Sequence, residues 1–580
     1  MNVDRSAAGA AAAGAQTAGV DTAGTNAAGT DAAGTDITRR RSLYLGLSAL
    51  VAVLWLAMLP LRPLFNPDEG RYAEIPREML ASRDWVIPHL NGLAYVEKPP
   101  LQFWATALSL DLFGDNEFAA RLYTALSALG SILAVALAAK RLWGGAAAFR
   151  AAAMLAGTLL FVILGQLLTL DMSLTLYMTC ALAAFLAAQS NAEEGRSPRA
   201  WMLAAWTAVA LGVLTKGLVA AAIPAAVLVL YSAYTRDFGP WRRLHAAGGL
   251  LLFLAITVPW HWLAQRRLPD FLEFFFVHEH FARYLTPSAD REESWWFFGA
   301  VFFLGSLPWT LPALRVLFLD WPRPGGRRGF DATLFLKIWV WFVCVFFSLS
   351  DSKLIPYILP AMPALALLTA SLPESPLGRD LSRTALGTVA IAIGLALLCL
   401  FAPGHIAPSD RSAYFLALRG PLAEIAVLLA VSGLYVLARR RRDATDAAMF
   451  LGAGWCLAGL LAMRAASAVA PIYSGVAIAR AFPAMPRDAP LYSIAMYDQT
   501  LPFYWGRTVE LVSYRGELDY GLRRDPGAEI PTVAQFVERW TQESSGFAVM
   551  EKPMFDELVK SGVPMREVAR DAGRVLAARR

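Results

Sequence analysis

Long apolar runs recur along the chain from Ser42 to about Met463, and short polar connections separate them. The runs are roughly 20 residues long, the length that a helix needs to cross a hydrocarbon core of about 30 Å. We count about thirteen such runs, at residues 43–61, 118–139, 146–167, 172–189, 200–215, 217–234, 246–264, 294–318, 332–349, 355–372, 385–402, 416–437 and 446–466. The pattern predicts a mostly α-helical, polytopic integral membrane protein.

Basic residues follow the same alternation. Every second connection is short and carries Arg or Lys: Lys140 with Arg141, Arg196 with Arg199, Arg236 with Arg242 and Arg243, Arg323 with Arg327 and Arg328, Arg379 with Arg383, and Arg439 to Arg442. Cytoplasmic loops accumulate basic residues, and Arg39–Arg41 precede the first run, so the N-terminus is predicted to be cytoplasmic. An odd number of spans then places the C-terminal segment outside the cytoplasm, in the periplasm of a Gram-negative cell.

The two ends of the chain differ from its middle. Residues 1–38 are rich in Ala, Gly and Thr and bury too little apolar surface to fold, so we expect a disordered tail. Residues 39–470 form the predicted transmembrane domain, with residues 62–117 as its first periplasmic loop. Residues 471–580 read as a small soluble α/β domain, with strands at 491–497, 508–514 and 546–550 and helices at 533–541 and 555–560.

The amino-acid composition limits the classes of function that are possible for this chain. Hydrophobic residues make up 57% of the chain, charged residues only 17%, and the net charge is +6. The basic residues are confined to short connections, a pattern that indicates membrane orientation and excludes a nucleic-acid partner. All four cysteines lie in apolar runs without metal-ligand spacing, which argues against disulfides and thiolate metal sites. The C-terminal segment contains no nucleotide-binding loop, so no nucleotide cofactor is expected.

The first loop is crowded with ions although it directly follows an apolar run. Between residues 66 and 100 it carries Asp68, Glu97 and Lys98 together with aromatic and proline residues. The segment from Gly70 to about Ala81 reads as an amphipathic helix lying on the membrane. Asp68 and its neighbour Glu69 could alternatively cap the N-terminus of that helix.

Other ionisable residues converge on the same predicted membrane face. They are Asp171, Lys216, His278, His280, Arg283 and Lys353. Charges beside hydrocarbon are costly and usually functional, so the pattern predicts a site at the external water–lipid boundary. The alternative for Lys216 and Lys353 is that their ammonium groups simply reach the lipid headgroups.

Two kinds of chemistry fit these residues. Glu97 and His278 are candidate ligands for Zn²⁺, with His280 as an alternative, although interfacial histidines also hydrogen-bond to loops. Lys98 and Arg283 come from separate loops and provide the cations that a phosphate at the membrane surface requires.

Several motifs resemble one known family. Asn66-Pro-Asp-Glu-Gly-Arg-Tyr-Ala-Glu-Ile-Pro-Arg-Glu-Met-Leu and Tyr95-Val-Glu-Lys-Pro-Pro resemble the first external loop of bacterial aminoarabinose transferases, which are protein-mannosyltransferase-like glycosyltransferases of the GT-C type. Leu-Thr-Lys216-Gly and Ser-Lys353-Leu-Ile-Pro-Tyr357 look like motifs of the same family. The resemblance implies transfer of 4-amino-4-deoxy-L-arabinose from undecaprenyl phosphate to a phosphate of lipid A.

The resemblance also implies roles for individual residues. The contacts to the donor phosphate map to Lys98, Arg283 and Tyr357, the Zn²⁺ ligands map to Glu97 and His278, and the important acidic residues map to Asp68 and Asp171. We further assign Glu69, Tyr95, Lys216 and Lys353 to substrate binding. Together these assignments predict a site for the sugar-bearing lipid.

The proposed reaction displaces a polyprenyl phosphate from a glycosyl carbon. Cations that bind the leaving phosphate more tightly as charge develops lower the barrier, which is the role given to Lys98 and Arg283. For a hydroxyl acceptor Asp68 would serve as general base, whereas a lipid A phosphate needs no base. Asp68 and Asp171 would then bind the amino group of the donor, orient it, or stabilise positive charge on the ring.

Two other functions share parts of this argument. One is the transfer of another sugar, such as mannose or galactosamine, from the same lipid to protein or glycan. The other is a flippase or transporter of lipid-linked sugars, which would place its ions near the midplane and carry internal repeats. The ions here gather at one face and we find no repeat, so transport is disfavoured. The sequence suggests no protein partner.

Overall fold

The computed structural model describes residues 23–282, 293–319, 321–322, 329–401, 410–439, 443–482, 486 and 488–580. Its helices over the apolar part of the chain are α1 (Ala23–Ala57), α4 (Glu117–Trp143), α5 (Gly145–Ala156), α6 (Leu159–Leu164), α7 (Leu170–Glu193), α8 (Arg199–Lys216), α9 (Val219–Thr235), α10 (Gly239–Arg242), α11 (Ala246–Arg267), α13 (Phe297–Gly305), α14 (Thr310–Phe318), α15 (Ala332–Ser348), α16 (Ala361–Ala370), α17 (Glu374–Phe401), α18 (Asp410–Arg439) and α19 (Ala444–Ala465). Every predicted apolar run therefore contains helix.

Not every run forms one continuous helix. The run at 146–167 is divided between α5 and α6 at Gly157, and the run at 294–318 is divided between α13 and α14 near Pro308, which has no N–H to continue a helix. In the described part of the chain, seven helices are long and apolar enough to cross a membrane: 38–61, 117–143, 170–193, 246–267, 374–401, 416–439 and 444–473. The multi-pass helical architecture is confirmed, and the number thirteen stays a prediction.

The disorder predicted for residues 1–38 stays a prediction, because residues 1–22 lie outside the described part. Helix α1 begins at Ala23 and includes residues 23–38. The described residues up to Leu50 belong to a unit of their own, in which the Ser42 hydroxyl donates to the Thr38 carbonyl at 3.1 Å.

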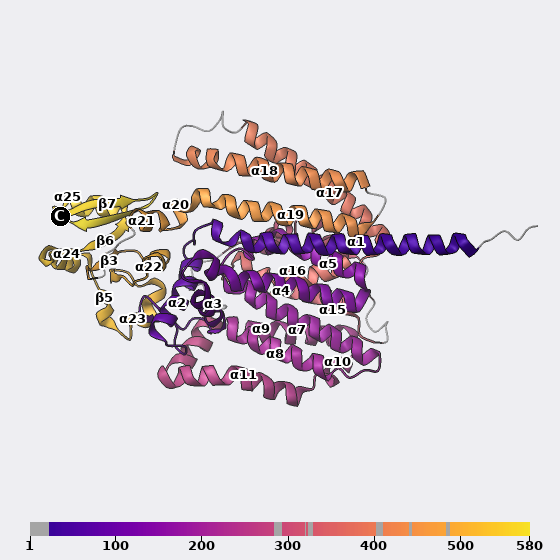
Figure 1. Ribbon diagram of the computed structural model, residues 1–580. Helices are drawn as coiled ribbons and strands as arrows, with labels where there is room; N and C mark the ends of the chain where they lie inside the picture. The colour runs from indigo at the N-terminus through magenta and orange to yellow at the C-terminus, as the bar shows by residue number, and fades with distance from the viewer. Residues whose placement is uncertain are drawn as a thin grey trace, which may run out of the picture. The chain divides into compact units, whose positions relative to one another are not determined.

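The second unit, residues 51–580, contains the helix bundle. Helices α4, α7, α8 and α11 run side by side in it (Figure 1). Helix α7 lies deep within the bundle, and residues 168–175 at its beginning are buried without exception. Asp171 is therefore enclosed by protein at the end of a helix, a costly position for an ionisable group that needs a specific partner.

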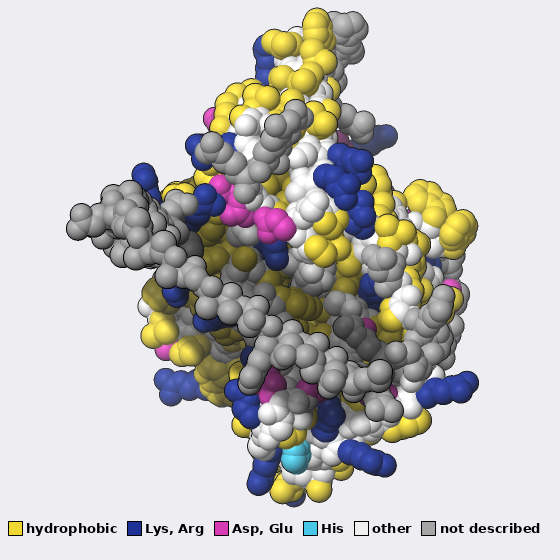
Figure 2. Space-filling view, turned by 90° about the vertical axis from the view of Figure 1, so that its right-hand side faces the viewer, with side chains coloured by type: hydrophobic (Ala, Val, Ile, Leu, Met, Phe, Trp, Pro, Cys, Tyr) yellow, Lys and Arg dark blue, Asp and Glu magenta, His cyan; other side chains and the backbone are white. Residues whose placement is uncertain are grey.

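The outside of the bundle is apolar over long stretches. The α17–α18 hairpin, at the top of Figure 1, exposes large apolar side chains that include Leu386, Ile393, Leu397, Val427, Val431 and Leu434. A space-filling view from one end of the bundle shows apolar side chains along the flanks, with Lys and Arg around the visible face (Figure 2). An apolar circumference with basic residues at one end is the surface expected of a protein embedded in lipid.

The C-terminal domain is the predicted α/β domain. Its strands are β3 (Leu491–Ile494), β4 (Glu510–Val512), β5 (Glu529–Ile530), β6 (Phe547–Glu551), β7 (Met565–Arg570) and β8 (Arg574–Arg579), and its longer helices are α22 (Thr500–Trp505), α24 (Val533–Gln542) and α25 (Lys552–Lys560). The sheet order is β5-β4-β3-β6-β8-β7, parallel from β5 to β6 and antiparallel at β8 and β7. Ser493 in the centre aligns with Leu511 on one side and Val549 on the other.

One face of this sheet has a small aromatic core. Tyr492, Phe536 and Trp540 are fully buried there, and the ring centroids of Phe536 and Trp540 are 5.4 Å apart. The strands at 491–497, 508–514 and 546–550 and both helices were predicted from sequence. Strands β7 and β8 were not, because Arg566, Glu567 and the other charged residues in them obscure the alternation of an edge hairpin.

The first loop folds as α2 (Asp68–Ser82), the hairpin β1 (His89–Leu90) with β2 (Leu93–Ala94), and α3 (Leu101–Phe113). The predicted helix exists, but it does not lie on a membrane surface as we expected. Residues 69–76 of α2 are all buried, between α3 and α22 of the C-terminal domain. A Cβ atom on Gly70 would lie 2.5 Å from the carbonyl carbon of Gln499, so only glycine allows this close contact.

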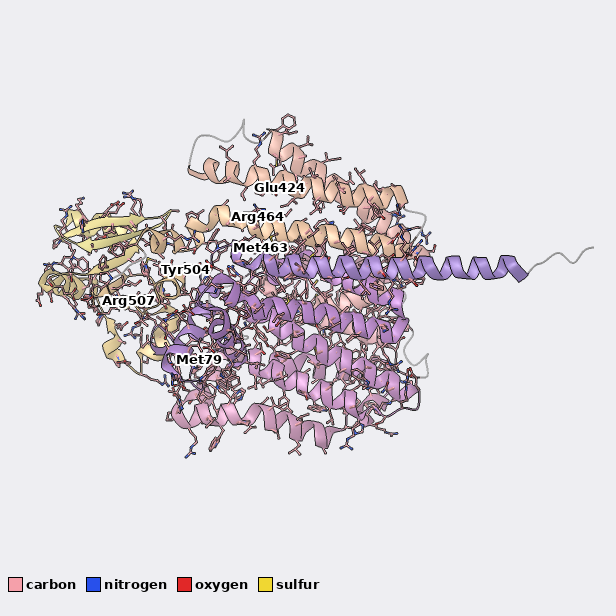
Figure 3. All side chains as sticks on the ribbon, in the orientation of Figure 1. Met79, Glu424, Met463, Arg464, Tyr504 and Arg507 are labelled. Atoms are coloured by element: carbon pink, nitrogen blue, oxygen red, sulfur yellow. The ribbon has the colours of Figure 1, made fainter. Side chains whose placement is uncertain are left out.

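Buried polar contacts join the first loop to the C-terminal domain. Asn91 donates to the Val509 carbonyl at 2.9 Å and accepts from the Val509 N–H at 2.8 Å, and the Leu64 N–H donates to the Tyr504 hydroxyl at 2.8 Å. Figure 3 shows Tyr504 and Met79, which belong to the two sides of this junction. Loop and domain therefore form one structural block on the helix bundle.

The junction contains a buried carboxylate whose ionisation is unfavourable. Burial raises the pKa of Glu74 to about 8, assisted by the nearby Glu78, although two hydrogen bonds from Arg77 (2.6 and 2.7 Å) lower it. The usual value is 4.5, so this group stabilises the fold fully below pH 4.5 and loses that contribution as pH rises through 8. At about 1.4 kcal/mol per pKa unit, the ionisation of Glu74 at high pH lowers the free energy of unfolding by a few kcal/mol.

We expect Glu74→Gln, which cannot ionise, to become more stable relative to the wild type between pH 5 and pH 9. The measurement is the apparent Tm of both purified proteins at pH 5, 7 and 9, with Glu557→Gln on an exposed helix as the control. A difference in Tm between wild type and Glu74→Gln that stays constant over this range would contradict the raised pKa.

Candidate active site

The candidate site lies where the first loop, the ends of the bundle helices and the C-terminal domain meet. Asp68 begins α2 with a half-exposed side chain, and its Oδ1 lies 3.5 Å from Nη1 of Arg71. Arg71 is nearly buried and forms a second ion pair with Glu517 of the C-terminal domain. Gln499 donates to Glu517 Oε1 at 2.8 Å, so the C-terminal domain fixes the arginine beside Asp68.

Burial and neighbouring charges together set the pKa values of Glu517 and Arg71. Burial raises the pKa of Glu517, and the charges of Glu97 and Asp68 raise it further, while Arg71 and Gln499 lower it. Burial also lowers the pKa of Arg71, but the surrounding acidic and phenolic groups outweigh it and the net pKa is well above the usual value. Arg71 therefore stays a cation amid carboxylates.

The phenol of Tyr72 is influenced by several acidic groups. Burial raises its pKa, and the charges of Asp68, Glu97 and Asp171 raise it further, while Arg71 lowers it. The shared site that we expected for Asp68, Glu97 and Asp171 from sequence stays a prediction.

Tyr95, Glu97 and Lys98 lie together at the end of the β1–β2 hairpin. The buried Tyr95 hydroxyl donates to Oε2 of Glu97 at 3.1 Å. Burial, with Glu97 nearby, raises the pKa of Tyr95 well above its usual value, so the phenol remains a neutral donor. The half-buried Lys98 donates to the Glu97 carbonyl at 2.9 Å.

A second group joins three separate helical elements. Lys216, the last residue of α8, donates to Oδ1 of Asp171 in the first turn of α7 at 2.5 Å. Its Nζ also lies 5.1 Å from the ring centroid of Tyr357, in η3 (Ile355–Ile358). Lys353 is buried four residues before that tyrosine. Asp171, Lys216 and Tyr357, each singled out in the sequence, are thus brought into one contact.

Glu69 has a different environment from the one we expected for a substrate-binding residue. It is 2% exposed, and its carboxylate accepts hydrogen bonds from Arg62 and Arg121 and from the backbone N–H groups of Phe65 and Leu168. Burial alone would raise its pKa, but Arg121 and Arg62 hold it well below the usual range. With every oxygen occupied, the position supports a role in the fold instead of contact with substrate.

Three predicted residues cannot be placed. Arg283 lies outside the described residues, and the side chains of His278 and His280, within the π-helix η2 (Glu273–Ala282), are also outside the described part. Among the side chains that are described, no group of three His, Cys, Asp or Glu residues could hold a metal ion. The Zn²⁺ prediction therefore stays a prediction, with Glu97 as its one described ligand.

Sequence reasoning overlooked Arg71, Gln499 and Glu517. Arg71 was seen only as part of an amphipathic helix, and no residue of the C-terminal domain was assigned to the site. The available signal was Arg-Gly-Glu517-Leu-Asp, an ionic motif in a domain otherwise built from short strands. Nothing local in that motif indicates that Glu517 reaches an arginine more than 400 residues earlier in the chain.

The arrangement suits a reaction of an anionic lipid. Carboxylates and cations alternate at the ends of helices, with Lys98 and Lys216 among the cations. Preorganised cations stabilise a phosphate leaving group, and carboxylates stabilise a cationic sugar or bind an amino group. The described residues therefore suit the binding of a phosphate beside a positively charged group.

Comparisons with known proteins agree with this chemistry. Residues 477–579 match the family model of the aminoarabinose transferase C-terminal domain, and residues 97–262 match that of dolichyl-phosphate-mannose-protein mannosyltransferase. The undecaprenyl phosphate-α-4-amino-4-deoxy-L-arabinose arabinosyl transferase of Aeromonas salmonicida is 31% identical over 532 residues, covering 84% of this chain and 89% of that protein. This chain belongs to the same transferase family.

Other relatives extend the agreement to the fold. The transferase of the same description from Aeromonas hydrophila is 30% identical over 81% of this chain and 86% of its own length. The crystal structure of ArnT from Cupriavidus metallidurans bound to undecaprenyl phosphate superposes with a TM-score of 0.84 at 34% identity, covering 93% of this chain and 98% of that one. The family resemblance drawn from the first loop is confirmed, and the protein is a multi-pass, lipid-linked-sugar-dependent glycosyltransferase.

Proposed function

We propose that the protein transfers 4-amino-4-deoxy-L-arabinose from undecaprenyl phosphate to phosphate groups of lipid A. The observation that carries the proposal is the contact of Asp171, Lys216 and Tyr357 at the ends of separate helical elements. Relatives that align over most of this chain carry this donor and sugar in their descriptions, which supports the same substrates here.

The proposed topology has thirteen spans in the inner membrane, with the N-terminus in the cytoplasm. The site and the C-terminal domain would face the periplasm. The positive-inside rule supports this orientation, because Lys140 and Arg141 end α4 and Arg242 lies in the connection before α11, away from the site. Lys and Arg surround the bundle end in Figure 2.

In this mechanism cations bind the phosphate and carboxylates act on the sugar. Lys98, with Arg283 and Tyr357, would hold the phosphate of the donor, and charge develops on that phosphate as the glycosidic bond breaks. Asp68 and Asp171 would orient the amino sugar or stabilise positive charge on its ring. The lipid A phosphate is already ionised and attacks the glycosyl carbon without a base.

Lys353 remains a proposed substrate contact, together with Lys216 and Tyr95. Lys216 is held by Asp171 and lies over the Tyr357 ring. Tyr95 orients Glu97 through its hydroxyl. We infer that these residues contact the sugar, whereas Lys98 is assigned to the phosphate.

Zn²⁺ fits this proposal only as a structural ion. Glu97 has a carboxylate of the kind that binds Zn²⁺, already oriented by Tyr95, and His278 or His280 would complete the site. A bound Zn²⁺ would link the first loop, which carries Glu97, to the segment that carries His278 and His280. Metal analysis of the purified protein, compared with Glu97→Gln, tests the assignment directly.

The proposed modification replaces negative charge on the outer surface with an amine. Lipid A that carries the amino sugar attracts cationic peptides less strongly, so the protein would confer resistance to polymyxin. The decisive experiment is mass spectrometry of lipid A from cells with and without the gene. An added aminopentose on a phosphate supports the proposal, whereas a different added sugar, or sugar on protein, would favour the mannosyltransferase-like alternative.

A further inference from the structure

The segment between α11 and His278 is packed firmly at its core. Phe271 and Phe275 are fully buried, with ring centroids 5.3 and 6.4 Å from that of Trp260 in α11. Val96, which directly precedes Glu97 and Lys98, is buried in the same cluster. The segment 268–277 is therefore packed against the part of the first loop that carries the proposed phosphate ligand.

The C-terminal domain also contacts this segment. Arg524 forms an ion pair with Asp270, and its guanidinium carbon lies 3.7 Å from the ring centroid of Tyr520. The Tyr520 ring lies 4.2 Å from that of Phe274, and its hydroxyl donates to Asp270 at 3.4 Å. Four side chains from two distant parts of the chain thus form one contact, which we name the Asp270 contact.

The Asp270 contact is separate from the contacts that anchor the domain. The domain is joined to the first loop through other hydrogen bonds, of which Asn66 with Asp498 and Asn91 with Val509 are examples. Asp270 itself is half-exposed, and an exposed ion pair contributes little to overall stability. A contact that contributes little to the fold but links the domain to one segment affects mainly where that segment lies.

We propose that Tyr520 and Arg524 are positioning residues for the donor site. They hold segment 268–277 against the part of the first loop that carries Lys98. The Phe274–Tyr520 ring contact and the charge-assisted bond to Asp270 restrict the segment in addition to its contacts with Trp260. This inference rests on the proposed function, because it takes the undecaprenyl-linked donor as the molecule that binds beside the positioned segment.

The test uses full-length protein and two measurements. Hydrogen exchange of segment 268–277 reports its mobility without any substrate, and binding of undecaprenyl phosphate reports the site without the sugar. We expect Arg524→Ala to speed exchange in the segment and to weaken undecaprenyl phosphate binding five- to tenfold. In transfer assays it should raise the KM for the donor by a similar factor and change kcat less than twofold.

The neighbouring Arg523 provides the matched control. It is exposed and pairs with Asp519 inside the domain, so Arg523→Ala should change neither measurement. Asp270→Ala should have the same effect as Arg524→Ala on exchange and on binding of undecaprenyl phosphate. The double variant should bind no more weakly than either single variant. The exchanged pair Asp270→Arg with Arg524→Asp should recover part of the affinity.

Three results would overturn the inference: unchanged exchange in Arg524→Ala, faster exchange with unchanged donor binding, or an equal effect of Arg523→Ala. A lowered Tm in Arg524→Ala without recovery in the exchanged pair would also reject positioning in favour of a purely structural role. Failure of the wild type to bind undecaprenyl phosphate would instead refute the proposed function, and the exchange data would still report on the contact.

Discussion

Lys98→Ala is expected to lose at least a hundredfold of its transfer activity while expression and folding stay normal. Lys98 is half-buried between the hairpin and α3, and its ammonium is held by the backbone carbonyl of Glu97. A preorganised charge that stabilises the transition state raises kcat by a factor of about 10²–10³. In Lys98→Ala the departing phosphate has no such charge beside it. The measurement is transfer from the undecaprenyl-linked sugar to lipid A in membranes matched for protein amount.

The control for this prediction is Lys552→Ala. Lys552 is an exposed lysine that pairs with Asp556 on α25, so its loss removes one positive charge far from the proposed chemistry. Lys98→Arg should retain a measurable part of the activity, because it keeps the charge but changes its geometry. If Lys98→Ala keeps more than a tenth of wild-type activity, the assignment of Lys98 to the donor phosphate is wrong.

The membrane setting explains which site residues were predictable from sequence. Asp171 and Lys216 stood out because an ion at the end of an apolar helix is costly unless a partner lies nearby, and the structure pairs them. Tyr357 carried no such signal by itself and was found through a family motif. The structure adds a physical link, since Lys216 lies over its ring.

Residues whose partners are distant in sequence were harder to interpret. Helix α2 looked amphipathic because its charged residues recur with helical spacing, and the expected environment was therefore lipid and water. Arg71 instead pairs with Glu517 of a domain that begins some 400 residues later, and Glu69 pairs with Arg121 of α4. Periodicity reports that a face is polar, but it does not report whether that face meets solvent or buried partners.

The number of membrane spans was also difficult to predict from the sequence pattern. The run at 355–372 forms the short η3 turn and α16 (Ala361–Ala370), and α16 is too short to cross a bilayer by itself. Pro356 and Pro360 have no N–H to continue a helix through this run, whereas the run is apolar enough as a whole to resemble a span. Apolar runs identified where helices lie, but their continuity depends on the positions of single prolines.

Glu69→Gln is expected to destabilise the protein by about 3–5 kcal/mol, the range for removing one partner of a buried ion pair. The substitution keeps the size of the side chain but removes the charge that two buried guanidinium groups share. Arg121 is 1% exposed and also donates to the carbonyls of Leu59, Arg62 and Pro63, so it cannot move to solvent. The apparent Tm of detergent-solubilised protein should fall by several degrees.

The pH dependence provides a sharper test of this Glu69 cluster. The folded-state pKa of Glu69 lies well below the usual 4.5, because Arg121 and Arg62 outweigh the effect of burial. Its contribution is therefore present above pH 4.5 and is lost as pH falls through the folded-state value. The difference in Tm between wild type and Glu69→Gln should be constant from pH 5 to 9 and shrink on further acidification, while the exposed control Glu538→Gln shows no difference. A Glu69→Gln protein as stable as wild type at pH 7, but inactive in transfer, would restore the substrate-binding role that we first assigned to this residue.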